Sequence, residues 1–284
     1  MFTLRRSVHH SSFYPGDCHL QVAEFLKEYR PAPPGSPPLL AAVVPHAGWC
    51  FSGGVAARTL KTLSDRSRPA SIVLFGAVHR AAIRRCAVYP TGEWMTPLGA
   101  VRIDEKLASD LLQELPDLLE ENPAAHETEH SLEVQLPFIH EIFPNIPVLP
   151  IMVPPDAPSV ELGSRVAAIV RDRSTVAVAT TDLTHYGDVY GFCPAGVGDR
   201  AHRWMRENDS RIIDMAVRME AEGITAEARK SWNACGPGAL SAAVAFAKAL
   251  GVRHGCLLER TDSHEVQERG ESFRMAVGYA GLVF

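Results

Sequence analysis

The sequence predicts an α/β fold, a three-layer sandwich in which helices cover both faces of a largely parallel central sheet. Several short runs are continuously apolar, as in strands that are buried on both faces. Helical patterns separate these runs, which is the order that builds parallel sheets. In addition, several of the runs end in a histidine or an aspartate. The apolar runs are residues 40–44, 71–76, 146–153 and 175–180.

Bulk composition narrows the class of protein. The 284 residues are 46% hydrophobic, which is enough for one α/β domain spanning residues 1–284. A formal net charge of −5 offers no broad basic surface, so we expect no nucleic-acid partner. We also expect no membrane span and no secretory signal, because no apolar run is long enough. The six cysteines are scattered without a C-x-x-C pair, which favours a reducing cytoplasm.

The first half of the chain alternates predicted helices and strands. Asp17 is placed to cap a helix over residues 18–29, and a Pro-rich connector follows. After the strand at 40–44, the chain is expected to turn through glycines before a helix that includes 55–60. The remaining expected elements are the buried strand 71–76, strands near 86–90 and 94–103, a helix over 104–115, and a polar loop over 120–129.

The second half continues the alternation to the end of the chain. A short helix at 132–143 is expected to be interrupted by Pro137, because proline lacks the backbone N–H group. Strand 146–153, helix 157–171 and strand 175–180 follow, and residues 199–230 form mostly polar, peripheral helix. An Ala-rich helix over 239–250 and two final strands over 254–261 and 274–284 complete the prediction.

Polar residues at the ends of the predicted strands form a candidate metal site. His46 and His79 each follow a buried strand, and Asp182 and His185 follow a third. Parallel strands bring their carboxyl ends to one edge, so these residues are expected to meet. Cys235 lies just before a helix, where the helix dipole favours the thiolate that binds metals. Imidazole and thiolate donors suit iron, copper and zinc, and the pattern does not choose among them.

Each of these residues also has an ordinary structural interpretation. A histidine at a strand end is commonly a hydrogen-bonding residue, and Asp182 fits a turn cap. His185 fits a core histidine, and Cys235 fits a small buried apolar residue. Their coincidence at several strand ends, rather than any one of them, supports a site.

One literal motif match is interpreted as fortuitous. His126-Glu127-Thr128-Glu129-His130 spells H-E-x-x-H, in which one long helix presents both histidines to zinc. Here the five residues follow Asn122-Pro123 in a polar loop without a helical apolar stripe. A metalloprotease is therefore not expected. The glycines after His46 match neither phosphate-binding motif.

The chain resembles the Memo-like family, known in prokaryotes as protein B of the AmmeMemoRadiSam system. The resemblance runs from residue 12 to the last predicted helix. The motifs that carry it are Ser12-Phe13-Tyr14-Pro15, Pro45-His46-Ala47-Gly48-Trp49, Thr96-Pro97-Leu98-Gly99, Glu129-His130-Ser131-Leu132-Glu133, Thr181-Asp182-Leu183-Thr184-His185 and Cys235-Gly236.

This resemblance implies the fold of class III extradiol ring-cleaving dioxygenases, whose non-haem iron(II) lies at the edge of the sheet. It implies His46, His79 and Cys235 as metal ligands, with iron(II) favoured and copper or zinc as alternatives. Asp182 and His185 match further pocket residues, His185 at the position of the dioxygenases' acid–base histidine. The chain departs from the family at Gly76-Ala77-Val78-His79, where the hydroxyl that could orient His79 is lost.

Three functions follow as expectations. The leading one is an iron-dependent, dioxygenase-like redox protein in which His185 moves protons and Asp182 orients it. Its partners would be a small-molecule substrate and other proteins of the AmmeMemoRadiSam system. The second is a metal-free hydrolase or transferase with Cys235 as nucleophile, His185 as base and Asp182 as orienting group. The third is a binding or scaffold protein that retains an enzyme-like pocket.

Overall fold

Four parallel strands form the centre of the main sheet. The computed structural model describes residues 4–267 and 272–284. Within them, all residues of the four central strands are buried, as their continuous apolar runs predict. Neighbouring strands in this group are parallel. In sheet order the strands are β2 (Ala41–Val44), β9 (Thr175–Thr180), β3 (Ser71–Gly76) and β8 (Val148–Met152).

A strand antiparallel to this centre lies at each of its edges, β12 (Ala276–Val283) beside β2 and β4 (Cys86–Val88) beside β8. Strand β12 also pairs with β10 (His185–Tyr186) and β11 (Cys256–Asp262). Beyond β4 lies β7 (Leu119–Glu121). A separate small sheet contains β1 (Leu4–Arg5), β5 (Glu93–Thr96) and β6 (Gly99–Arg102).

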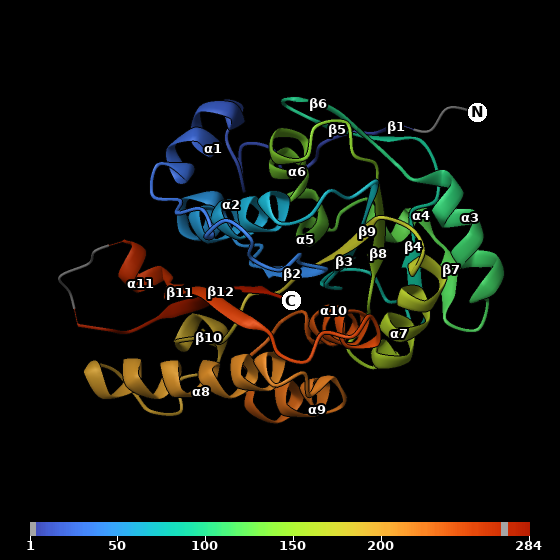
Figure 1. The fold of residues 1–284 in the computed structure, drawn as a ribbon. Coiled ribbons are helices and arrows are strands. Elements are labelled where there is room, and N and C mark those ends of the chain that lie inside the picture. Colours follow the sequence, from blue (N-terminus) through green and yellow to red (C-terminus); the bar gives the residue numbers. More distant parts are fainter. Residues whose placement is uncertain (1–3, 268–271) are drawn as a thin grey trace.

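Helices cover both faces of the main sheet, which confirms the layered α/β prediction (Figure 1). One face carries α1 (Cys18–Leu26), α2 (Trp49–Asp65), α5 (His130–Glu133) and α6 (Leu136–Ile142). The other carries α7 (Ser159–Val170) and α10 (Pro237–Ala249), with α9 (Ala221–Ser231) packed on α10 and α8 (Asp199–Val217) lying against β12. The remaining helical elements are α3 (Glu105–Glu114), α4 (Pro123–His126), the 3-10 turn η1 (Asp188–Tyr190) and α11 (Ser263–Val266). In the described ranges, every helix is too short or too polar to cross a membrane.

The structure differs from the sequence prediction in several places. Asp17 precedes α1 but makes no side-chain capping hydrogen bond among the described residues, and α1 ends at Leu26. Helix α2 begins at Trp49, so Gly53 and Gly54 lie inside it rather than in a turn. At Gly53 a Cβ atom would lie 2.5 Å from the Phe25 ring, so glycine serves close packing against α1. The expected polar loop 120–129 contains the end of β7 and all of α4. Asn122 caps α4 by accepting a hydrogen bond from Ala125 N at 3.2 Å.

A buried ion pair fastens the N-terminal segment to the sheet's helical layer. Arg5 donates to Glu133 at 2.7 Å and to the His126 carbonyl at 2.9 Å, and its guanidinium lies 4.1 Å from the Trp94 ring centre. Glu133 also accepts from His9 N at 2.7 Å and from the Tyr14 hydroxyl at 2.8 Å. These bonds satisfy the buried carboxylate from several sides.

Burial of His126 generates a testable pH dependence. The ring packs among Tyr89 and Trp94, and burial lowers the pKa of His126 to about 4. An unfolded histidine has a pKa near 6.5, so the unfolded chain takes up the proton first as pH falls. The free energy of unfolding that the neutral His126 contributes above pH 6.5 is therefore lost as the pH falls from about 6.5 to 4, by at most about 3 kcal/mol. We expect His126→Phe to remove much of that loss.

Urea unfolding at pH 7 and pH 4 measures the effect. Phenylalanine suits this aromatic site and removes the buried ring nitrogen Nε2, which has no hydrogen-bond partner among the described residues. The exposed His254, replaced in the same way, is the control. Equal losses of unfolding free energy in the wild type and His126→Phe would contradict this interpretation.

Candidate metal centre

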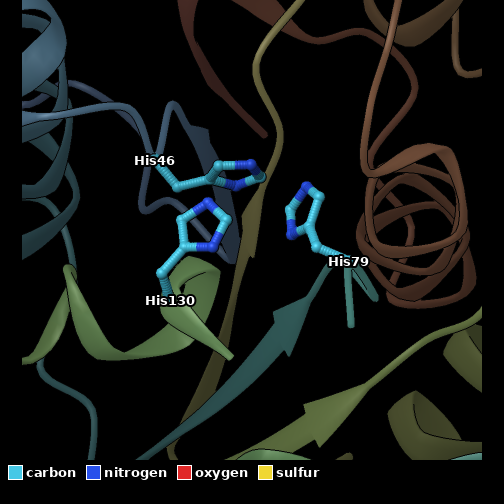
Figure 2. A group of neighbouring side chains, drawn as sticks. All are labelled: His46, His79 and His130. Atoms are coloured by element: carbon cyan, nitrogen blue, oxygen red, sulfur yellow. The ribbon is translucent and has the colours of Figure 1, made fainter. Parts of the chain in front are cut away.

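The ends of the central strands meet at one edge of the sheet. His46 follows β2, His79 follows β3, and Thr180 ends β9. His130 begins α5 and joins them from the neighbouring helical layer. Figure 2 shows the three imidazole rings turned toward one another. The parallel topology thus gathers residues that are far apart in the chain.

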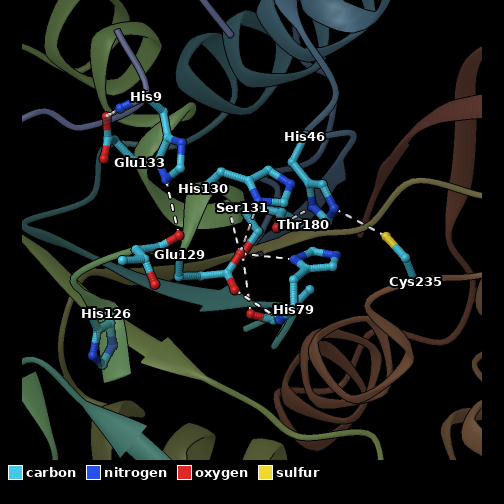
Figure 3. Close-up of polar contacts among 12 residues, drawn as sticks. His9, His46, His79, His126, Glu129, His130, Ser131, Glu133, Thr180 and Cys235 are labelled. Carbon is cyan, nitrogen blue, oxygen red and sulfur yellow. Dashed lines mark hydrogen bonds and ion pairs between the residues drawn. The ribbon is translucent and has the colours of Figure 1, made fainter. Parts of the chain in front are cut away.

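His46 occupies the centre of the cluster and is buried. Its Nδ1 atom lies 2.9 Å from Thr180 Oγ1, and its Nε2 atom lies 3.1 Å from Cys235 Sγ (Figure 3). Burial, and then the neighbouring His79, lower the pKa of His46 well below its usual value. The ring is therefore neutral near pH 7. With Nδ1–H donated to Thr180, Nε2 keeps the lone pair that a metal ion requires.

Asp182 connects the strand exits to Cys235. Its Oδ1 atom accepts hydrogen bonds from His46 N at 2.8 Å and Ala47 N at 3.2 Å. The Asp182 backbone also donates to Cys235 Sγ at 3.2 Å and accepts from Cys235 N at 3.1 Å. Burial raises the pKa of Asp182, although His185 and the N–H groups of His46 and Ala47 lower it. Asp182 therefore fixes the backbone of His46 and of Cys235, two of the candidate metal ligands.

The expectation that the helix start makes Cys235 a thiolate is wrong for the metal-free protein. Burial, and then the charge of Asp182, raise the pKa of the Cys235 thiol far above its usual value. The Asp182 N–H group and Thr181 act in the opposite direction and do not offset burial. The protonated thiol fits as a donor to His46 Nε2. A metal ion bound here would replace that proton.

The Glu129 carboxylate contacts His79 at both its ring and its backbone. Glu129 Oε1 lies 2.9 Å from His79 Nδ1, and Oε2 accepts from His79 N at 2.9 Å. Ser131 N also donates to Glu129 Oε1 at 2.9 Å. Burial raises the pKa of Glu129, but the bonds from His79 and Ser131 outweigh it and leave the pKa at about 2. The ionised carboxylate orients His79 and leaves its Nε2 free.

His130 was not predicted from the sequence as a candidate metal ligand, because the H-E-x-x-H match that contains it was interpreted as fortuitous. Its ring stacks on His79 with centres 4.5 Å apart and lies 5.3 Å from the His46 ring. Burial and then His79 lower the pKa of His130 to about 4. A zincin helix is nonetheless not formed, since α4 ends at His126 and α5 begins at His130. The sequence feature that could have identified His130 as a site residue is the family motif Glu129-His130-Ser131-Leu132-Glu133.

The donor atoms fall into two overlapping sets. Over residues 4–267 and 272–284, one set within 4.8 Å is His46, His79 and His130, and another is His46, Asp182 and Cys235. His46 belongs to both sets, whereas His79 and Cys235 fall in different ones. The expected ligands therefore lie on two sides of one imidazole, with His130 and Asp182 as additional donors. The mixed nitrogen, sulfur and oxygen donors fit a transition metal.

His185 stands outside both donor sets, between two cavities. Its Nδ1 atom lies 3.1 Å from the Leu183 carbonyl, and its ring meets Tyr190 edge-on at 5.2 Å. One cavity of about 530 Å³ reaches His130 and Asp182, and another of about 560 Å³ reaches His79 and Cys235. His185 and Tyr190 line both. The imidazole bonded to Cys235 is that of His46, so the expected pairing of Cys235 with His185 as its base is not observed.

Comparison with known proteins agrees with the sequence motifs. Residues 5–283 match the family described as Memo-like protein. The chain belongs to the Memo-like family. A MEMO1 family protein of Thermococcus onnurineus is 35% identical over 96% of each chain. One from Pyrococcus furiosus is 34% identical over 99% of this Memo-like chain and 98% of its own. An uncharacterized protein of Escherichia coli K12 has a TM-score of 0.47 and 13% identity, and covers 84% of this chain and 99% of its own.

The role of Glu129 in this Memo-like chain is testable by metal affinity. Glu129→Gln removes the negative charge and one acceptor from the His79 pair, so His79 loses its fixed tautomer. We expect metal affinity to fall roughly 10- to 100-fold. Competition of the purified protein against a chelator, with cobalt(II) as the ion, measures this change.

A matched control is available two residues away. Glu127 is exposed, so Glu127→Gln changes the same net charge without touching His79. Equal cobalt affinity in Glu129→Gln and Glu127→Gln would show that the carboxylate beside His79 does not prepare the site.

Proposed function

We propose that this Memo-like protein binds iron(II) through His46, His79 and Cys235 and acts as a dioxygenase-like redox protein. The supporting observation is the contact between His46 Nε2 and Cys235 Sγ at 3.1 Å. Thr180 and Glu129 engage the Nδ1 atoms of His46 and His79, so both Nε2 atoms are available. Bound iron would supply Lewis acidity and one-electron chemistry.

The protein's own residues prepare the ligands and the pocket. Thr180 and Glu129 hold the imidazoles in one orientation, and Asp182 holds the main chain of His46 beside Cys235. His185 lies in the walls of both cavities, where it can accept or donate a proton on a bound small molecule. The proposal favours iron among the metals that suit imidazole and thiolate, because of the dioxygenase resemblance noted above.

We also propose that the protein works in the reducing cytoplasm and has a small-molecule substrate and protein partners. A reducing cytoplasm would keep iron ferrous and the Cys235 thiol free of disulfides. The six cysteines are all unpaired in the structure, as that setting requires. The two cavities adjoining the cluster have the size of small-molecule sites. A small-molecule substrate and other AmmeMemoRadiSam proteins are the proposed partners.

Metal content of ligand variants tests the proposal. After anaerobic purification and loading with iron(II), we expect about one iron per wild-type chain. His46→Ala and Cys235→Ser should each weaken iron binding beyond the roughly 100-fold that loss of an orienting partner produces. His185→Gln should keep its iron, because His185 lies outside both donor sets.

Cys193→Ser is the control, because Cys193 is an exposed cysteine. Unchanged iron in both His46→Ala and Cys235→Ser would overturn the ligand assignment. Folding of each variant is checked by its far-UV circular dichroism, so that loss of iron is not confused with loss of structure.

A further inference from the structure

The cavity on the Cys235 side of the cluster has an apolar wall. Its volume of about 560 Å³ falls in the range of small-molecule sites. The inner end reaches Cys235, His79 and His185, and the sides come from the start of α10, the β9 exit and α9. The apolar lining residues are Pro155, Leu183, Tyr190, Ala228, Trp232, Ala234 and Pro237.

Charge at this cavity is internally balanced. Besides the imidazoles and the thiol, the ionisable acid and base among its lining residues are Asp156 and Arg229, which form an ion pair with each other. The formal charges of these two side chains therefore cancel at this cavity. The neighbouring 530 Å³ cavity also has one acid and one base in its lining, but there, among the described residues, Asp182 accepts from the His46 and Ala47 backbone and does not pair with Arg274. The two cavities thus suit different ligands, and the Cys235 side suits a neutral one.

Trp232 supplies an exposed aromatic surface at this cavity. Its side chain is 63% exposed, whereas Trp49 and Trp94 are buried. It caps the end of α9 with φ at +52°, a conformation that strongly favours glycine and that a bulky side chain rarely adopts. Its ring lies parallel to Phe192 at 5.7 Å, so the indole has a defined orientation. An exposed indole of fixed orientation in the wall of a cavity can stack on an aromatic ring of a ligand.

We propose that this cavity binds a neutral small molecule with a planar aromatic ring, which stacks on Trp232. The ring would lie over the alanines and prolines of the wall, with one edge toward His185 and Cys235. Burial of a flat apolar ring against this wall is favourable, and a charged ligand would lose hydration without gaining an opposite charge. The proposal concerns the protein without metal and does not depend on the proposed iron site.

Fluorescence titration of the metal-free protein tests the proposal. The probe is 6-propionyl-2-(dimethylamino)naphthalene, a neutral fluorophore whose emission shifts to shorter wavelength when it leaves water. Wild type should bind it saturably with one site. Trp232→Gly should weaken binding about tenfold, because the stacking surface is lost. Thr225→Trp, which adds a ring to the cavity wall, should weaken it by a similar factor.

A control and a competition complete the design. Leu20 on α1 is also 63% exposed, so Leu20→Ala removes a comparable apolar surface elsewhere and should leave binding unchanged. Naphthalene-2-carboxamide should displace the probe at least tenfold better than naphthalene-2-carboxylate. Glycine relaxes the backbone at position 232, so Trp232→Gly should melt no more than a few degrees below wild type.

Several results would overturn the inference. They are the absence of saturable binding to wild type, an equal affinity in Trp232→Gly or Thr225→Trp, and an equal loss in Leu20→Ala. Stronger competition by the carboxylate would overturn the assignment of a neutral ligand. Because metal is absent throughout, none of these outcomes bears on whether His46 and Cys235 bind iron.

Discussion

The buried carboxylate of Asp182 is the constraint on which the candidate site depends. It accepts hydrogen bonds from the backbone that follows β2, while its own main chain is bonded to Cys235. One residue at the end of β9 thereby fixes His46 and Cys235 relative to each other. Burying a carboxylate costs free energy, which two backbone N–H groups partly offset. A fold that keeps such a group at a strand exit preserves the geometry of the site at some cost in stability.

Orientation of the imidazoles is the next requirement, and two different groups supply it. Thr180 engages Nδ1 of His46 from the neighbouring parallel strand, and Glu129 engages Nδ1 of His79 from a connection before α5. Both rings then present Nε2. On the Cys235 side, the His46 ring is neutral and the Cys235 thiol keeps its proton, so a metal ion bound there must displace the thiol proton.

The architecture was predictable from local sequence because strand burial leaves a strong signal. The runs at β2, β3, β8 and β9 are continuously apolar, and each was placed correctly. The meeting of His46 and Asp182 also followed from parallel topology, since both follow strands whose ends share one edge. Cys235 lies instead at the turn before α10. Helix α2 was misplaced at its start, because Gly53 was interpreted as a turn residue. Its actual reason, contact with Phe25, is a tertiary contact that sequence spacing does not reveal.

The remaining features depend on contacts between distant segments. Glu129 contacts His79 from 50 residues away along the chain, and no local pattern predicts that contact. His130 was hidden in a motif that suggested the wrong fold. The protonation of Cys235 was misjudged because burial and Asp182 outweigh the helix dipole, and neither is visible in a local pattern.

The central claim is that His46 and Cys235 bind the same metal ion, and iron K-edge X-ray absorption tests it most directly. For the anaerobically iron(II)-loaded protein, the account predicts one sulfur neighbour at about 2.3 Å, the usual metal–thiolate distance, together with imidazole scattering. In Cys235→Ser the sulfur contribution should vanish. A spectrum of bound iron with only nitrogen and oxygen neighbours in the wild type would contradict the account.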